Sequence, residues 1–194
     1  MSNNLATEQI DDSLLIRFTR PKVRNPLSVA VLDELHTITD KCVDRPELSR
    51  IIFTGTDNVF ASGADLREID SISPGSARAF ALRGQSLMTK VTRLPQITIA
   101  AINGYCFGGA LDLALACKVR TASPNATFAH PGAGLGIITG WGGTQRLPQL
   151  IGQANAIEMF FTAEAIGAER ALAIELIDEI SDDVVAAALA ISTA

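Results

Sequence analysis

The stretch Ile97–Cys117 most limits how this chain can fold, because it is apolar at nearly every position and yet is interrupted by glycines. A transmembrane helix needs about 20 predominantly apolar residues, and this stretch comes near to that length. Asp112 falls inside it, however, and a carboxylate within a bilayer costs about 3 kcal/mol. The sequence therefore predicts a buried strand over 97–102, a glycine-rich turn and a buried helix over 109–116. We expect no membrane association.

The rest of the chain alternates between strand-like and helix-like segments. Pro74 is placed to open a helix, and the apolar residues after it recur with the spacing of one helical face. Ser28 is placed to cap an earlier helix. The expected strands are 13–19, 50–55, 97–102, 119–123, 126–130 and 176–180, and the expected helices are 29–44, 74–93, 109–116, a short one within 140–152, 153–162, 168–175 and 183–192.

Length and composition fit one globular α/β domain covering residues 1–194. The chain is 47% hydrophobic and 19% charged, which is too apolar for a disordered protein. A net charge of −5 without any basic stripe argues against nucleic acid as a partner. The 3 cysteines form no CxxC pair, and the first residues are polar and acidic, so we expect reduced thiols, no signal peptide and a cytoplasmic protein.

Two turns of small residues, Gly63-Ala64 and Gly108-Gly109, indicate chemistry. In each, backbone N–H groups can face a ligand with no side chain in the way. The second turn opens the apolar helix 109–116, where the helix dipole favours negative charge. Two such N–H groups converging on one oxygen make an oxyanion hole, which suits a thioester whose carbonyl becomes an enolate. Close packing between helix and sheet would account for the same glycines.

Five segments, in order and in register, resemble the crotonase superfamily, that is, the enoyl-CoA hydratase/isomerase family. They are RPKVRNPLS (20–28), FASGADLREI (60–69), PQITIAAINGYCFGGALDLALAC (95–117), ATFAHPGAGLGIITGWGGTQRLPQLIG (126–152) and ERALAIELIDEI (169–180). The resemblance implies an α/β fold, a crotonase-type spiral of ββα repeats, here with a shortened C-terminal helical region because the sequence stops at Ala194. It also implies a homotrimer or hexamer that acts on acyl-CoA thioesters, with coenzyme A as part of the substrate and no permanently bound cofactor or metal.

The resemblance also assigns residues by position. The two oxyanion N–H groups fall on Ala64 and Gly109. The family's contacts to coenzyme A fall on the loop around the first of these, and two basic residues match the end of the strand on the coenzyme A side. These binding residues are Lys22, Arg24, Ala61, Ser62, Gly63 and Asp65, of which Asp65 has the alternative of simply capping the next helix.

The chain departs from the family where hydration needs two glutamates that divide the acid and base roles. The first falls on Asp112, which is shorter by one methylene group. The second falls on Gly132, which cannot transfer a proton, so hydration by two carboxylates is doubtful. Asp112 alone can still shift a double bond, and His130 is a second candidate base. The structural alternatives are a buried or surface hydrogen-bonded aspartate and a hydrogen-bonded histidine.

Three other positions bear on the interpretation. Gly132 and the GWGG of 140–143 partly resemble the naphthoate synthase branch, some members of which use bound bicarbonate as the base; that branch lacks an acid matching Asp112. Trp141 either lines the acyl pocket or packs in the core. Glu175 falls where the family usually has a glycine in the left-handed conformation that ends a helix.

We therefore expect an enzyme that stabilises an acyl-CoA enolate, with isomerisation or a related reaction ranked above hydration. A non-catalytic subunit that binds coenzyme A esters or serves assembly is the main alternative. A purely structural protein and an RNA-binding protein are weaker ones.

Overall fold

The computed structural model describes residues 4–192, and its largest element is a sheet of six strands in the order β1-β2-β4-β7-β9-β12. Only β1 and β2 pair in antiparallel fashion, and all the other neighbours in this sheet are parallel. Its strands are β1 (Leu5–Ile10), β2 (Ser13–Phe18), β4 (Arg50–Thr54), β7 (Ile97–Ile102), β9 (Val119–Ala122) and β12 (Glu179–Ile180).

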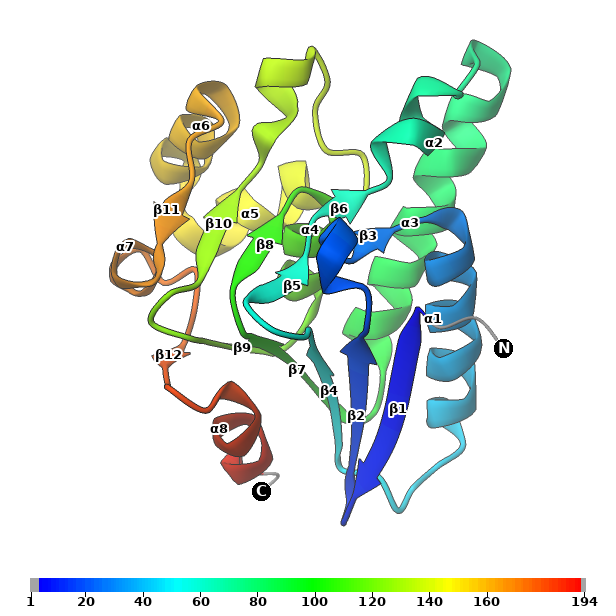
Figure 1. Ribbon diagram of the computed structural model, residues 1–194, viewed down its shortest axis with the longest axis vertical. Helices are drawn as coiled ribbons and strands as arrows, with labels where there is room; N and C mark the ends of the chain where they lie inside the picture. Colours follow the sequence, from blue (N-terminus) through cyan, green and yellow to red (C-terminus); the bar gives the residue numbers. More distant parts are fainter. Residues whose placement is uncertain (1–3, 193–194) are drawn as a thin grey trace.

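Short strands beyond the ends of this sheet form a second layer (Figure 1). Four of them pair in the order β11-β10-β8-β5, and β3 pairs with β6 in parallel. These strands are β3 (Pro26–Leu27), β5 (Val59–Ala61), β6 (Gly63–Ala64), β8 (Tyr105–Phe107), β10 (Thr127–Ala129) and β11 (Ile166–Gly167). The turns that carry the small residues belong to this layer.

The helices lie around the sheets, with α1 and α3 side by side on one flank and α8 near the C-terminus (Figure 1). The α-helices are α1 (Val29–Val43), α2 (Leu66–Asp70), α3 (Pro74–Arg93), α4 (Gly109–Ala116), α5 (Gly143–Ile151), α6 (Gln153–Thr162), α7 (Ala168–Ala173) and α8 (Val184–Ala190). Two 3-10 helices are η1 (Pro21–Val23) and η2 (Pro131–Leu135).

Alternation along the parallel strands divides the apolar residues between the two faces of the main sheet. On one face, Ile52 of β4 and Ile99 of β7 pack with Val184 of α8 in a small cluster. On the other face, Ile51 and Phe53 of β4 belong to the main core, which also contains α4 and α3. Because side chains alternate along a strand, burial of both faces requires the nearly continuous apolar runs seen in the sequence.

Helix α4 is buried on every side, and each of its residues from Ala110 to Ala116 is inaccessible or nearly so. This confirms the prediction of a strand, a turn and a helix in the stretch that resembles a membrane span, with β8 as an added short strand. No helix within residues 4–192 is both long and apolar enough to cross a membrane.

Most predicted elements are confirmed, including their caps. Ser28 accepts a hydrogen bond from the N–H of Val31 at the start of α1, and Ser73 forms a capping box with Ser76 ahead of Pro74. The structure differs in three places. The polar segment 5–10, for which no element was expected, is a strand, because its backbone pairs along all of β2. The strand expected over 126–130 ends at Ala129, since Pro131 starts η2. The strand expected over 176–180 is reduced to Glu179–Ile180.

Candidate active site

The two small-residue turns meet in the folded chain. Gly63 has φ +86°, and a Cβ built on it would lie 2.6 Å from the backbone nitrogen of Gly109 and 2.7 Å from the carbonyl oxygen of Phe107. Only glycine tolerates both this conformation and this approach. The turn that contains Ala64 is therefore packed directly against the first residue of α4.

This contact brings Ala64 and Gly109, the two predicted donors, to one place. Gly109 is the first residue of α4, so its N–H has no partner within the helix, and the N-terminal end of a helix favours negative charge. Ala64 lies in the two-residue strand β6, which is held by its parallel pairing with β3. Both residues line the same cavity.

That cavity has a volume of about 340 Å³, and its wall is mostly apolar. Helix α2 and the segment after it contribute Ile69 and Ile72, and α3 contributes Phe80. Apolar side chains at the rim remain exposed, among them Leu135 and Ile138. A wall of this kind suits an apolar chain better than a charged one. The full lining is Ser62, Ala64, Leu66, Ile69, Ile72, Ala77, Phe80, Ala81, Gly108, Gly109, His130, Pro131, Gly132, Leu135, Ile137, Ile138, Thr139, Gly140 and Trp141.

Trp141 both lines the cavity and packs in the core, so neither alternative for it excludes the other. Its ring lies between α3 and α4, where a Cβ on Gly84 would come within 2.2 Å of the ring and one on Gly109 within 2.3 Å. The ring of Phe80 packs against it with 5.7 Å between centroids. The indole therefore fixes the spacing of the two helices at the head of the cavity.

Asp112 lies behind the wall of the cavity rather than in it. The residue is fully buried, and Thr139, which does line the cavity, donates its hydroxyl hydrogen to Oδ2. The other oxygen, Oδ1, has no hydrogen-bond partner and lies 3.6 Å from Nε2 of His130. A Cβ on Gly143 would come within 2.2 Å of Oδ1, so a glycine there makes room for the carboxylate.

Burial moves the pKa values of this pair in opposite directions. Removal from water raises the pKa of Asp112 from its ordinary 3.8 to about 7, although the Thr139 hydroxyl and the Arg146 guanidinium oppose this rise. Removal from water also lowers the pKa of His130 from 6.5 to about 4. Desolvation always disfavours the charged form, which is the base for aspartate and the acid for histidine. The aspartate therefore titrates near neutral pH.

Gly132 cannot be replaced by a larger residue while the backbone stays in place. A Cβ on it would lie 2.5 Å from the carbonyl oxygen of Ile137, and the N–H of Ile137 donates to the carbonyl of Gly132. The tight loop thus leaves no carboxylate at this point of the cavity wall. Because residue 132 lies in η2, it does not continue a strand from His130.

The other predicted binding residues lie on the same side of the molecule as β5 and β6. Lys22 and Arg24 are exposed, within and just after η1, and the guanidinium of Arg24 lies over the ring of Tyr105 at 5.2 Å from its centroid. Ala61 is fully buried, so neither its side chain nor its backbone is exposed to a ligand, whereas Ser62 lines the cavity.

Asp65 has a structural task, as its alternative predicts. It is the N-cap of α2, accepts from the N–H of Arg67 and forms an ion pair with the Arg67 guanidinium at 2.6 Å. The Arg67 hydrogen bond holds the pKa of the Asp65 carboxyl below its ordinary value.

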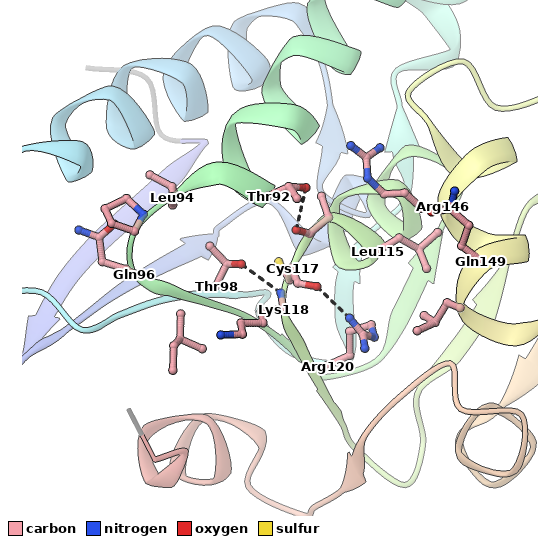
Figure 2. Close-up of a pocket in the computed structure, with 14 residues that line it drawn as sticks. Thr92, Leu94, Gln96, Thr98, Leu115, Cys117, Lys118, Arg120, Arg146 and Gln149 are labelled. Atoms are coloured by element: carbon pink, nitrogen blue, oxygen red, sulfur yellow. Dashed lines mark hydrogen bonds between the residues drawn. The ribbon is translucent and has the colours of Figure 1, made fainter. Parts of the chain in front are cut away.

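A second and larger hollow, of about 660 Å³, lies at the opposite end of α4, and its wall mixes polar and apolar groups in equal measure (Figure 2). There the carbonyl oxygens that end the helix are occupied: Thr92 donates to Ala116, and Arg120 donates to Cys117. Arg120 is buried, and its guanidinium also binds the carbonyl of Leu176 and pairs with Asp178 at 3.1 Å. The polar groups of this hollow thus hold the fold together.

Sequence reasoning did not single out Thr139, which the structure places against Asp112. Its signal was weak, because a lone threonine inside a glycine-rich loop is common in turns.

Cys42, Cys106 and Cys117 are buried free thiols, which burial makes harder to ionise. Within residues 4–192, no group of three or more His, Cys, Asp or Glu residues could hold a metal ion.

Comparison with known proteins gives one consistent result. Residues 10–194 match the sequence model of the enoyl-CoA hydratase/isomerase family. Crotonyl-CoA hydratase of Syntrophomonas wolfei is 35% identical over 178 residues, which are 91% of this chain and 68% of that protein. Short-chain-enoyl-CoA hydratase of Clostridium acetobutylicum is 35% identical over 179 residues, or 92% of this chain and 69% of that protein.

Solved structures agree. Pseudomonas aeruginosa DspI superposes with a TM-score of 0.92 at 32% identity, over 97% of this chain and 78% of that one. Enoyl-CoA hydratase from Bacillus anthracis gives a TM-score of 0.91 at 33% identity, over 96% of this chain and 74% of that one.

Proposed function

This chain belongs to the enoyl-CoA hydratase/isomerase family, and we propose that it binds an acyl-CoA thioester and stabilises its enolate between the N–H groups of Ala64 and Gly109. The observation that carries this proposal is the contact between Gly63 and the backbone nitrogen of Gly109 at the head of an apolar cavity. An oxygen held there would accept from two backbone donors at a helix N-terminus, which is the arrangement that stabilises an oxyanion.

The acyl chain would extend along the apolar wall, and the coenzyme A part of the bound substrate would extend past Ser62 toward the exposed Lys22 and Arg24. Coenzyme A carries phosphates, so two exposed cations on that side are suited to it. Coenzyme A arrives as part of the substrate, and the proposed reaction uses no resident cofactor.

Proton transfer falls to the buried pair of Asp112 and His130. The carboxylate of Asp112 has a pKa of about 7, so it is partly ionised at neutral pH and can both take up and return a proton. An enolate reaction that removes a proton at one carbon and returns it at another needs only one such group. Hydration by two carboxylates is disfavoured, because Gly132 supplies none and its loop has no room for one.

The test is deuterium exchange at the α-carbon. The protein is incubated in D2O with saturated and unsaturated acyl-CoAs, and the mass gain of each substrate is followed. We expect uptake by the wild-type protein and loss of uptake in Asp112→Asn, while Gly167→Ala, remote from the site and with no atom near its Cβ position, behaves as wild type. Equal uptake by Asp112→Asn would move the base elsewhere.

A non-catalytic subunit that binds coenzyme A esters is the second candidate. The position of Asp112 behind the cavity wall and the glycine at 132 favour it. Tight binding of acyl-CoA without deuterium uptake across the whole panel would support this candidate and contradict an enolate enzyme.

The oligomer implied by the resemblance, a homotrimer or hexamer in the cytoplasm, belongs to the same proposal. Ile157 and Phe161, one helical turn apart on α6, are exposed and support a contact with another copy. Sedimentation equilibrium measures the state directly, and a monomer at micromolar concentration would contradict the proposal.

A further inference from the structure

Three unpartnered buried atoms lie together beside the cavity. Oδ1 of Asp112 and both ring nitrogens of His130 are inaccessible to solvent and make no hydrogen bond. Buried polar atoms are nearly always paired, so such a group indicates either a missing ligand or a function. Nε2 and Oδ1 are 3.6 Å apart, and an approach of about 0.6 Å would make a normal hydrogen bond.

The route between the cavity and the carboxylate passes through only a few side chains. His130 and Thr139 both line the cavity and both contact Asp112, which does not line it. The Thr139 hydroxyl has one hydrogen and gives it to Oδ2. His130 has two ring nitrogens, one beside Oδ1 and one free of any partner.

We propose that His130 relays the proton between the acyl substrate and Asp112, and that Thr139 is the positioning residue that holds the carboxylate for this transfer. The inference rests on the proposed function, since it assigns the path of the proton in that reaction.

The transfer balances as a double shift through a neutral imidazole. Nδ1 is inaccessible in this structure, so the step requires the imidazole to become exposed to the cavity. Nδ1 then takes the proton from the substrate carbon, and the electron pair of the broken C–H bond moves to the thioester oxygen as the enolate. At the same time Nε2 gives its hydrogen to Oδ1 of Asp112. The imidazole remains neutral with its hydrogen on the other nitrogen. Reversal of both shifts returns the proton to a substrate carbon.

The surroundings of the pair fix its geometry. The ring of Phe160 packs on the imidazole, with 5.1 Å between centroids. Thr139 anchors Oδ2, so Oδ1 is the oxygen that stays toward Nε2. The charged group that acts on Asp112 is Arg146 from α5, and the carboxylate in turn raises the pKa of the Cys106 thiol of β8.

The test of the relay is rescue by a free base. In His130→Ala, we expect α-proton exchange to fall by about 100-fold or more, in line with loss of a general base. Added imidazole should restore part of the rate with saturation, because the variant leaves a ring-sized space beside the cavity. A merely structural histidine would not give such rescue. His130→Phe, which keeps a ring against Phe160, serves as the unrescued control.

The test of Thr139 uses two matched variants. Thr139→Val removes the hydroxyl at constant shape, and Thr139→Ser keeps it. Loss of a hydrogen bond to the carboxylate raises the pKa of Asp112 further, so the acidic limb of the exchange rate should move to higher pH in the valine variant. The serine variant should keep the limb of the wild-type protein. Identical limbs in all three proteins would overturn the role of Thr139.

Failure of the inference and failure of the proposed function give different results. If the wild-type protein exchanges α-protons and both His130 variants keep most of that rate, the relay is wrong and Asp112 meets the substrate directly. If the wild-type protein binds acyl-CoA and exchanges nothing, the proposed function is wrong and the relay with it. If the His130→Ala variant does not fold, the His130→Phe variant carries the test, and retained exchange in it refutes the relay.

Discussion

The two ends of α4 treat their polar groups in opposite ways. At the C-terminal end, the carbonyls of Ala116 and Cys117 are bound by Thr92 and Arg120 (Figure 2). At the N-terminal end, Gly109 lines the cavity, and Asp112 and His130 keep unpartnered atoms close by. Unpaired buried polar groups cost free energy, so a fold keeps them only where the surroundings enforce them.

The difference shows which end of the helix is structural and which is available for chemistry. The larger hollow lies at the structural end, and the smaller, apolar one lies at the reactive end. Size alone would therefore point away from the proposed site. Changes at the N-terminal end should alter activity, whereas changes at the C-terminal end should alter stability alone.

The largest effect is expected at the contact between the two turns. In Gly63→Ala, the new Cβ would lie 2.6 Å from the Gly109 nitrogen, so the turn must move and the two N–H groups separate. Loss of one oxyanion donor costs about 100-fold to 1000-fold in rate. We expect a fall of that size in the rate of α-proton exchange, measured together with acyl-CoA affinity. A rate equal to that of the wild-type protein would contradict the assignment of the N-terminal end of α4 to chemistry.

The buried pair should show itself in the pH dependence of stability. Between about pH 4 and 6.5 the pair binds one proton in both states, on Asp112 in the folded protein and on His130 in the unfolded one. Because folding then changes no proton number, the pair as a whole adds no pH dependence to the stability. Each single variant removes this cancellation. In Asp112→Asn only the histidine remains; its pKa is lowered by folding, so stability should rise with pH.

In His130→Phe only the aspartate remains; its pKa is raised by folding, so stability should fall from about pH 4 to 7. In each variant, the free energy of unfolding should change by about 3 kcal/mol relative to wild type between about pH 4 and 6.5. Urea unfolding at several pH values measures both. Parallel curves for the three proteins would show that the two groups are not buried together.

A smaller effect is expected at the other end of α4. Arg120→Met removes hydrogen bonds to the carbonyls of Cys117 and Leu176 and the pair with the half-exposed Asp178. We expect a loss of about 2 kcal/mol in the free energy of unfolding, from hydrogen bonds made by a charged group. Exchange per folded molecule should stay unchanged. A loss of exchange per folded molecule without a matching loss of stability would show that this end of the helix also contributes to activity.

The smallest effect concerns Glu175, which has φ +63° at the turn after α7. A non-glycine residue in this conformation costs about 1 kcal/mol, so Glu175→Gly should raise the midpoint of thermal unfolding slightly. The side chain is exposed, and exchange should not change. A lowered midpoint would mean that the carboxylate makes a stabilising interaction.

The sequence predicts the fold class correctly, because five motifs in register and the periodicity of long elements agree. Helix 109–116 and the helix from Pro74 are right to the residue, since buried and amphipathic helices carry strong patterns. The short strands β3, β5, β6, β8 and β11 were not predicted, because so short a pairing depends on neighbours distant in the chain. The left-handed conformation of Glu175 was predicted and is confirmed.

The site is harder to predict from the sequence. The assignments of Ala64, Gly109 and Asp112 rest on position within motifs and stay predictions of role. That Asp112 lies behind the wall, with His130 and Thr139 in front of it, depends on how β10 ends and how the loop after it returns. No local pattern records that arrangement, because its members are separated by 18 and 27 residues.

Trp141 gives this chain a built-in optical probe. It is the only tryptophan of the sequence, and its indole lies in the cavity wall against the first residue of α4. Excitation of tryptophan therefore reports on one place in the molecule, the head of the cavity, free of background from other indoles. A ligand entering there changes the polarity around a ring that is now only 3% exposed, so occupancy can be titrated by emission without any label.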